Sequence, residues 1–134
     1  MDLDGYIRAI NAHDWDGIVS YYTDDVVYED LTLGERHQGR EAVKAFWQTA
    51  AADFSSDFRM EVVRSFGTGT DYAMEWVFKG THDGSNPQLA ATGKQFAVHG
   101  LTLGRLEGER IKENKDVWNM AEFLSQVGLM PAPA

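Results

Sequence analysis

Apolar residues in the first third of the chain recur with the spacing of helices. Leu3, Tyr6, Ile7 and Ile10 lie at positions i, i+3, i+4 and i+7, so they share one helical face. The same spacing recurs over residues 15–22, after Asp14, a residue type that caps helix N-termini, and over residues 39–51. The pattern therefore predicts three helices, with a short strand at 26–30 and a loop at 31–38 before the third.

The period changes to that of strands in the second half. Residues 57–66 alternate loosely and end at a Gly-Thr-Gly-Thr turn, and residues 71–80 place every second side chain on one aromatic face. Residues 94–106 are predicted to form a long strand that turns at 107–108 and returns antiparallel over 109–118. A short helix is expected at about 120–127.

Helices that come first and antiparallel strands that come later are typical of an α+β domain. Gly100 and Gly104 lie inside the long strand, where glycines are candidate bend points for a strongly curved sheet. Such a sheet, with three N-terminal helices on its concave face and the short C-terminal helix beyond it, would form a cone.

The composition indicates one compact domain over residues 1–134. The chain has 43% hydrophobic residues and a net charge of −9, so it can bury a core with a pocket but is repelled by phosphate backbones and anionic membranes. We therefore expect no nucleic-acid or membrane partner. It contains no cysteine, which excludes thiolate nucleophiles and thiolate metal sites. The acidic start does not look like a signal peptide and no apolar run approaches ~20 residues, so a cytoplasmic location is expected.

The strand at 26–30 ends with two acidic residues. Glu29 and Asp30 point to opposite faces of the strand, so one of them should face inward. A carboxylate among aromatic side chains has its pKa pushed up from ~3.9, toward values that are useful in proton transfer. The alternative is a solvated aspartate at the end of a strand.

Aromatic residues from both halves of the chain could project into one interior. A packed core explains most of them, but a buried tyrosine needs a partner for its hydroxyl, so two inward tyrosines suggest a polar pocket floor. The candidates for lining the pocket are Tyr6 and Tyr22, expected on helices, with Trp47, Tyr72, Trp76 and Trp118.

The four histidines have no metal-ligand spacing, and no metal site is predicted. His99 lies in the middle of the long strand and is the histidine expected in the interior, either as a core residue or in the site. His37 and His82 lie in loops that could border a pocket. Asp116 and Asn119 flank Trp118, and Asn119 could simply cap the last helix.

Four segments together resemble the nuclear transport factor 2-like superfamily, specifically its SnoaL-like polyketide cyclase and ketosteroid isomerase-like branches. These segments are YIRAINAHDWDGIVSYYTDDVVYED at 6–30, QGREAVKAFW at 38–47, LEGERI at 106–111 and DVWNMAEFLSQVGLMP at 116–131. The resemblance covers nearly the whole chain and implies the conical α+β fold. It also implies a homodimer through the outer face of the sheet, where Val62, Phe66 and Leu103 would need covering.

The resemblance to ketosteroid isomerase implies that Asp30 is a catalytic base and Tyr6 an oxyanion donor. Tyr22 matches a second, supporting tyrosine, and Trp47 stands where the third tyrosine of that network would be. The oxyanion aspartate of that family falls near Thr102, where this chain has no acid.

The resemblance to the polyketide cyclases points to the end of the last strand. Members commonly have a Trp/Tyr-Asp pair there, with the aspartate as the acid/base residue, whereas this chain has Trp118 and Asn119. Asp116 is then the nearest replacement acid, and His99 is a possible partner from the adjacent strand.

Both branches imply a cofactor-free acid/base enzyme acting on a small cyclic or polycyclic carbonyl compound. A carboxylate removes an α-proton, a phenol or amide stabilises the enolate oxygen, and an apolar cone encloses the ligand. Two alternatives remain. One is a non-catalytic module that binds a hydrophobic ligand or a protein. The other is a hydrolase of epoxides or similar substrates that activates water between Asp30 and Asp116.

Overall fold

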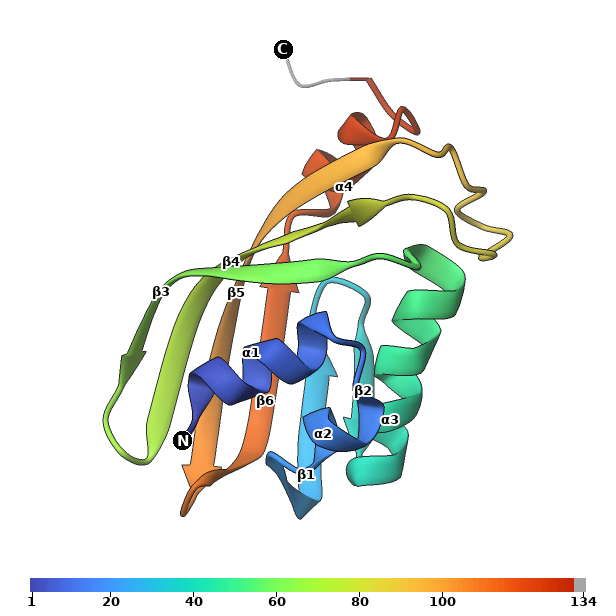
Figure 1. The fold of residues 1–134 in the computed structure, drawn as a ribbon. Coiled ribbons are helices and arrows are strands. Elements are labelled where there is room, and N and C mark those ends of the chain that lie inside the picture. The colour runs from blue at the N-terminus through green and yellow to red at the C-terminus, as the bar shows by residue number, and fades with distance from the viewer. Residues whose placement is uncertain (132–134) are drawn as a thin grey trace.

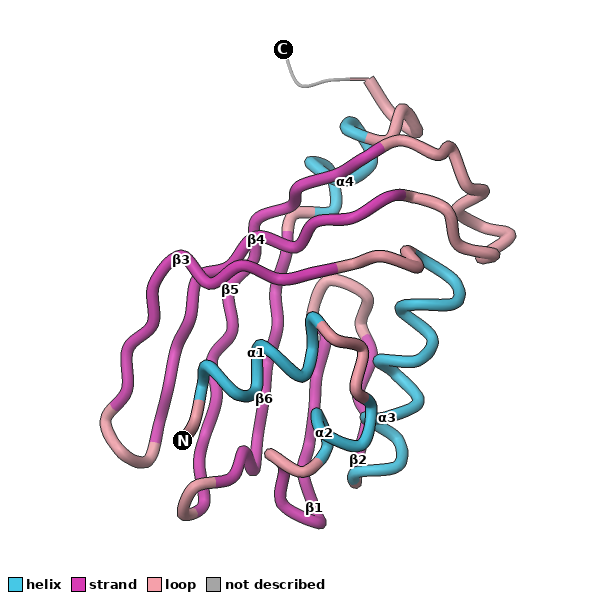
Figure 2. Tube along the Cα trace, in the orientation of Figure 1, coloured by secondary structure: helices cyan, strands magenta, loops and turns pink. Residues whose placement is uncertain are grey.

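The computed structural model describes residues 1–131 and has an α+β architecture built on one curved, unclosed six-stranded sheet (Figures 1 and 2). The helices are α1 (Leu3–Asn11), α2 (Trp15–Val19), α3 (Arg40–Thr49), which runs on into a π-helical turn (Ala50–Phe54), and α4 (Met120–Gln126). The strands are β1 (Tyr22–Asp30), β2 (Glu35–Gln38), β3 (Arg59–Gly67), β4 (Asp71–Thr81), β5 (Gln95–Glu107) and β6 (Arg110–Trp118).

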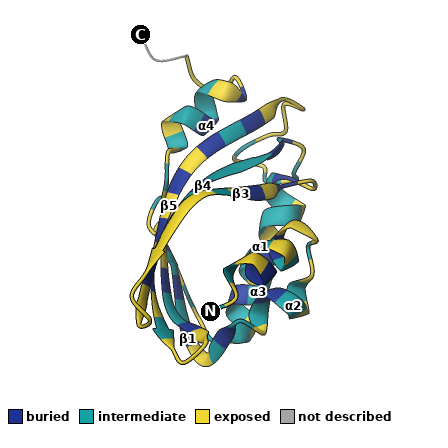
Figure 3. Ribbon diagram, turned by 60° about the vertical axis from the view of Figure 1, so that its left-hand side comes forward, coloured by how far each residue is buried: buried dark blue, intermediate teal, exposed yellow. Residues whose placement is uncertain are grey.

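The strand order is β2-β1-β6-β5-β4-β3, and β1 and β6 are the parallel pair in an otherwise antiparallel sheet. Helices α1, α2 and α3 lie on the concave side of the sheet, whereas α4 follows β6 and lies beside the first half of β5 (Figure 3). The predicted fold class is confirmed. The parallel pairing matters for function because it brings the end of β1 beside the end of β6.

The first two helices each begin directly after an aspartate, a residue type that favours the N-cap position. Asp2 and Asp14 are N-caps whose carboxylates accept hydrogen bonds from the backbone N–H groups of Gly5 and Gly17, at 2.9 and 3.1 Å. A cap of this kind stabilises a helix by about 1 kcal/mol. The prediction that Asp14 starts the second helix is therefore confirmed.

Two predictions about local structure are wrong. The second helix ends at Val19, and Tyr22 is the first residue of β1, where it pairs with Ile111 of β6. Helical spacing over eight residues could not detect this pairing with a distant strand. The predicted loop at 31–38 contains β2, an edge strand with the polar sequence ERHQ, which has no apolar alternation to reveal it.

The two glycines of β5 make room for aromatic rings. Gly100 lies opposite Trp76 on β4, and Gly104 lies opposite Tyr72. A Cβ atom at either glycine would come within 2.2 Å of the facing ring. The glycines predicted as bend points thus let two aromatic side chains lie flat across the sheet, as in other aromatic–glycine cross-strand pairs.

Replacement of Gly100 by Ala is expected to destabilise the protein by about 1–3 kcal/mol, because the Trp76 ring must move to admit the new methyl group. Urea denaturation measures the effect. Gly67→Ala is the matched control, since its Cβ would meet nothing closer than 3.7 Å. Equal stabilities of the two variants would contradict this packing.

The apolar core has two parts. The larger part lies between the three N-terminal helices and the concave face of the sheet. The smaller part joins α4 to the first half of β5 and consists of Phe96, Val98, Phe123 and Val127. The cavity described next lies where the two parts meet, since residues from both line it.

Candidate active site

A cavity of about 600 Å³ opens between the sheet, α3 with its π-helical turn, the loop after β4 and the start of α4. This volume lies within the range of small-molecule sites. Six Trp and Phe side chains line it: Phe46, Trp47, Phe54, Trp76, Phe78 and Trp118. Tyr28 and Asp116 line its buried end, whereas Leu33 and Glu35 are exposed and lie at its mouth.

Asp30 is the last residue of β1 and faces the cavity, with 4% of its surface exposed. Trp118 Nε1 donates to its two carboxylate oxygens, at 3.2 and 3.0 Å, and the backbone N–H of Leu33 donates to Oδ1 at 2.9 Å. Burial raises the pKa of Asp30, and these donors oppose the rise. The expectation that one of the two acids ending this strand faces inward is confirmed, and that acid is Asp30.

Asp116 on β6 is the second carboxylate of the cavity, with 7% of its surface exposed. The Tyr28 hydroxyl donates to its Oδ2, while Thr102 Oγ1 and Asn114 Nδ2 donate to Oδ1 at 2.6 and 2.9 Å. Burial raises the pKa of Asp116 to about 6, although all three hydrogen bonds lower it. This carboxyl group therefore changes its charge close to neutral pH.

A second layer of aromatic side chains holds the donors to Asp116. Trp76 Nε1 donates to Thr102 Oγ1 at 2.8 Å, and the Tyr72 hydroxyl donates to Asn114 Oδ1 at 2.6 Å. Two of the three donors to the carboxylate, Thr102 and Asn114, are thus fixed by rings from β4. Such support keeps a catalytic group in one geometry. The Trp76 ring also lines the cavity, whereas Tyr72 does not.

The two carboxylates are direct neighbours in the sheet. Asp30 of β1 is the register partner of Asp116 on the parallel strand β6, so their side chains leave the same face one strand apart. Their surroundings differ, since Asp30 accepts from an indole and a backbone amide and Asp116 from three side chains. The hydrolase alternative requires Asp30 and Asp116 to face one site, and both carboxyls line the same cavity.

The raised pKa of Asp116 predicts a pH-dependent stability. The folded protein binds this proton more tightly than the unfolded chain, so the stabilisation is complete below about pH 4 and is lost as the pH rises to about 6. The loss amounts to about 3 kcal/mol, taking ~1.4 kcal/mol per pKa unit. Asp116→Asn removes the titration, so the unfolding free energy of wild type relative to the variant should fall over this interval.

Urea denaturation of both proteins at pH 4, 5, 6 and 7 measures that difference. Carboxyls that do not interact with Asp116 titrate alike in both proteins and cancel in the comparison. A constant difference between the two proteins across the series would show that Asp116 does not titrate in this range.

The phenols assigned to the oxyanion site lie behind the cavity wall. The hydroxyls of Tyr6 and Tyr22 are 2.7 Å apart, and Trp47 Nε1 donates to that of Tyr22 at 3.1 Å. Tyr6 is fully buried and does not line the cavity. The network implied by the resemblance therefore forms, but the phenol that reaches the cavity is that of Tyr28.

Of the residues predicted to bind the ligand, some line the cavity and others lie behind its wall. Trp47, Trp76 and Trp118 line the cavity, whereas Tyr22, Tyr72 and Thr102 support it from behind.

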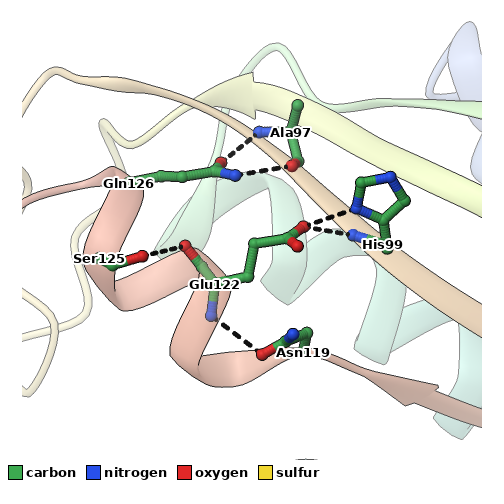
Figure 4. Close-up of polar contacts among 6 residues, drawn as sticks. All are labelled: Ala97, His99, Asn119, Glu122, Ser125 and Gln126. Carbon is green, nitrogen blue, oxygen red and sulfur yellow. Dashed lines mark hydrogen bonds and ion pairs between the residues drawn. The ribbon is translucent and has the colours of Figure 1, made fainter. Parts of the chain in front are cut away.

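His99 and Asn119 do not line the cavity. Both instead form hydrogen bonds with Glu122 of α4 (Figure 4). The expectation that His99 is interior is wrong, because 65% of its side chain is exposed and its Nδ1 pairs with Glu122 at 2.9 Å. Thr102 faces inward, and a residue three positions away in a strand faces the other side. Asn119 is the N-cap of α4 and accepts from the backbone N–H of Glu122 at 3.0 Å, the capping alternative stated above.

The sequence reasoning missed one buried residue near the site, Tyr28, and did not foresee the burial of another, His82. Tyr28 lies two positions before Asp30, so strand alternation places both on one face, and this signal was available. His82 is fully buried and contacts Thr92 Oγ1 and the Leu89 carbonyl, which ties together the loop at the cavity mouth. Its surroundings could not be read from a polar loop sequence.

Within residues 1–131, no group of three or more acidic or histidine side chains is arranged to hold a metal ion. Over the same residues, every helix is too short or too polar to span a bilayer.

Solved structures with similar folds come from several bacteria. IdmH of Streptomyces antibioticus, provisionally assigned as a polyketide cyclase, has a TM-score of 0.82 and 25% identity, with 94% of this chain and 95% of that chain covered. A protein of Xanthomonas campestris with the same provisional assignment has a TM-score of 0.80 and 24% identity, covering 93% of each chain. A Catenulispora acidiphila protein with a ketosteroid isomerase-like fold, solved with trimethylamine, has a TM-score of 0.83 and 21% identity, covering 94% and 91%.

No functionally curated protein shows significant sequence similarity to the chain. The family profile described as SnoaL-like polyketide cyclase matches residues 3–127. This match covers nearly the whole sequence, and the structural neighbours share its fold. The chain belongs to the SnoaL-like polyketide cyclase family, within the ketosteroid isomerase-like group of folds.

Proposed function

We propose that the protein is a cofactor-free acid–base enzyme that acts on a small cyclic or polycyclic carbonyl compound, as an isomerase or a cyclase. The observation that carries this proposal is the pairing of Asp30 and Asp116, two buried carboxyls in register on β1 and β6 that face one aromatic cavity. Paired titratable groups in unlike surroundings are typical of acid–base sites.

Asp30 is the better candidate for the base. Within residues 1–131, its carboxylate accepts from a single side chain, that of Trp118, and from the backbone of the turn that contains Leu33, whereas the carboxylate of Asp116 accepts from three side chains. Asp30 therefore keeps more of its lone pairs free toward the cavity. Burial raises its pKa, and a carboxylate with a raised pKa removes a proton more effectively. In this role it takes the proton on the carbon next to the substrate carbonyl.

Tyr28 is the candidate donor to the enolate oxygen, in place of Tyr6. Burial raises the pKa of Tyr28 far above its ordinary value, so the phenol keeps its proton at neutral pH. Asp116 holds the phenol by a hydrogen bond. When Asp116 is itself protonated it can donate to the Tyr28 oxygen, which frees the phenol proton for the substrate. A donor placed in this way lowers the barrier by stabilising the charge that develops.

Exchange of α-protons for deuterium tests this function without knowledge of the final product. Cyclic and polycyclic ketones are incubated in D2O with the protein, and loss of the α-proton signal is followed by NMR. The proposal predicts exchange above the buffer rate for ketones that fit the cavity. Buffer-rate exchange across the whole panel would favour the ligand-binding alternative.

A water-activating hydrolase is the second candidate, and the register pairing of Asp30 with Asp116 is what favours it. Asp30 would take a proton from a water molecule while the oxygen of that water attacks an epoxide carbon. The carbon–oxygen bond of the ring would break, and Asp116 would protonate the released oxygen to give a diol. Incubation of cyclic epoxides in H2¹⁸O separates the candidates, because this reaction alone places the label in the product.

We also propose that the protein is a homodimer, joined through the outer face of the sheet. Phe66, Leu101, Leu103 and Val117 are exposed there and are linked by strand register, with Phe66 and Leu103 each 63% exposed. Exposed apolar patches of this kind mark interaction surfaces. Val62 does not belong to this surface, because it packs against the core.

Leu101→Glu is expected to convert the dimer to a monomer, because two carboxylates would be buried at the interface and the register partners of position 101, Glu75 and Val117, offer no positive charge. Sedimentation velocity at micromolar concentration measures the change. Ala90→Glu, in the exposed loop after β4, is the control and should leave the dimer intact. A monomeric wild-type protein would refute the proposal.

A further inference from the structure

The charged side chains that line the cavity all have one sign. Asp30, Glu35, Asp53 and Asp116 contribute carboxyl groups, and no Lys, Arg or His belongs to its lining within residues 1–131. Glu35 and Asp53 lie near the mouth and are partly or fully exposed, whereas the other two acids are buried. The site therefore presents negative charge at its entrance and along its wall.

Three of these acids form a row across the sheet. Glu35 of β2 is the register partner of Asp30, which in turn is the register partner of Asp116. Like charges placed side by side on neighbouring strands repel. Burial is the main cause of the raised pKa values of Asp30 and Asp116, and the neighbouring carboxylate adds to each.

The adjacent row on the outer face has the opposite arrangement. There Glu29 lies between Arg36 and Lys115, its register partners on the same two strands. On the outer face, positive and negative side chains alternate across the three strands. On the cavity face, all three side chains of the row are acidic.

Side chains of the protein only partly offset the charge at the mouth. Glu35 Oε2 lies 3.3 Å from His37 Nε2, and Asp53 accepts a hydrogen bond from Ser85 Oγ at 3.3 Å. The aromatic walls, like the acids, favour a positively charged ligand, because the faces of Trp and Phe rings attract cations. A cation in the cavity would relieve the repulsion among the acids, and an anion would increase it.

We propose, on the basis of the function proposed above, that the carbonyl compound taken by this cavity carries a protonated amine or a quaternary ammonium group. The positive group lies at the mouth beside Glu35, and the carbonyl oxygen reaches Tyr28 at the buried end. The same charges weaken the binding of substrates with a carboxylate or a phosphate.

Three ligands with one ring system test the charge preference. These are 2-naphthol, 6-(trimethylammonio)-2-naphthol and 6-hydroxy-2-naphthoate, titrated by calorimetry at pH 7.5 and low salt. We expect the cation to bind about 10-fold more tightly than the neutral ligand, and the carboxylate about 10-fold more weakly. Equal affinities, preference for the anion, or no binding of any ligand would overturn the proposal.

Two variants test the position of the cation. Glu35→Gln should weaken binding of the cation by about threefold and leave 2-naphthol unchanged. Glu29→Gln removes the same charge from the other face of the sheet and should change neither affinity. Loss of cation affinity in both variants alike, or in neither, would overturn the assignment to Glu35.

The result is independent of catalysis, because binding is measured without turnover. Preference for the cation with no ketone exchange would refute the proposed function alone. Ketone exchange without a charge preference would refute this inference alone.

Discussion

Asp30→Asn is expected to slow α-proton exchange of a cyclic ketone by about 10²–10⁴-fold, the usual contribution of a general base. The amide has the shape of the carboxylate and can still accept from Trp118 Nε1 and from the backbone of Leu33, so the cavity should keep its geometry. It cannot take up the proton. NMR-detected exchange in D2O measures the rate.

Glu29→Gln is the control for this prediction. Glu29 precedes Asp30 in β1 and points to the opposite face, so the substitution changes the same charge outside the cavity. Its exchange rate should match that of wild type. An unchanged rate in Asp30→Asn would remove Asp30 as the base.

Tyr28→Phe is expected to lower the exchange rate by about 10²–10³-fold, the effect of removing one oxyanion donor. The substitution also removes one of the three hydrogen bonds that lower the pKa of Asp116, so that pKa should rise above about 6. Carboxyl ¹³C NMR of wild type and variant follows the titration. The two readouts together separate loss of the donor from a loss of folding.

Tyr6→Phe provides a matched comparison, because it removes one hydroxyl from another buried tyrosine. Its hydroxyl bonds to Tyr22 behind the cavity wall, so we expect an exchange rate within about threefold of wild type. The opposite ranking, with Tyr6→Phe the more damaging, would return the oxyanion role to Tyr6.

Much of the architecture could be predicted from local patterns. Helical spacing and the Asp14 cap located the early helices, and alternation located the long strands. Tyr22 was assigned to a helix because its strand conformation depends on pairing with β6, which is distant in the sequence. β2 was assigned to a loop because it is a short polar edge strand with no apolar alternation. Such pairing leaves no periodic signal in the segment itself.

For the site, the sequence could predict which side chains of one strand face inward, but not which strands lie next to each other. Alternation places Asp30 inward, and the same rule would have placed Tyr28 beside it. Both faces of β5 carry apolar residues, so alternation there could not decide the side of His99. The meeting of Asp30 with Asp116 could not be predicted, because it requires the parallel pairing of β1 with β6 in one particular register. The hydrogen bonds from Thr102 and Asn114 depend on that packing as well.

A crystal structure with bound 2-naphthol would test most directly whether Asp30, Tyr28 and Asp116 act on one ligand in this cavity. A planar phenol resembles the enolate of a cyclic ketone, so its oxygen should lie within hydrogen-bond distance of the Tyr28 hydroxyl, with its rings between the Trp47, Trp76 and Trp118 side chains and the Asp30 carboxylate against the ring. A naphthol bound outside this cavity, or inside it with its oxygen away from Tyr28 and Asp116, would contradict the proposed chemistry.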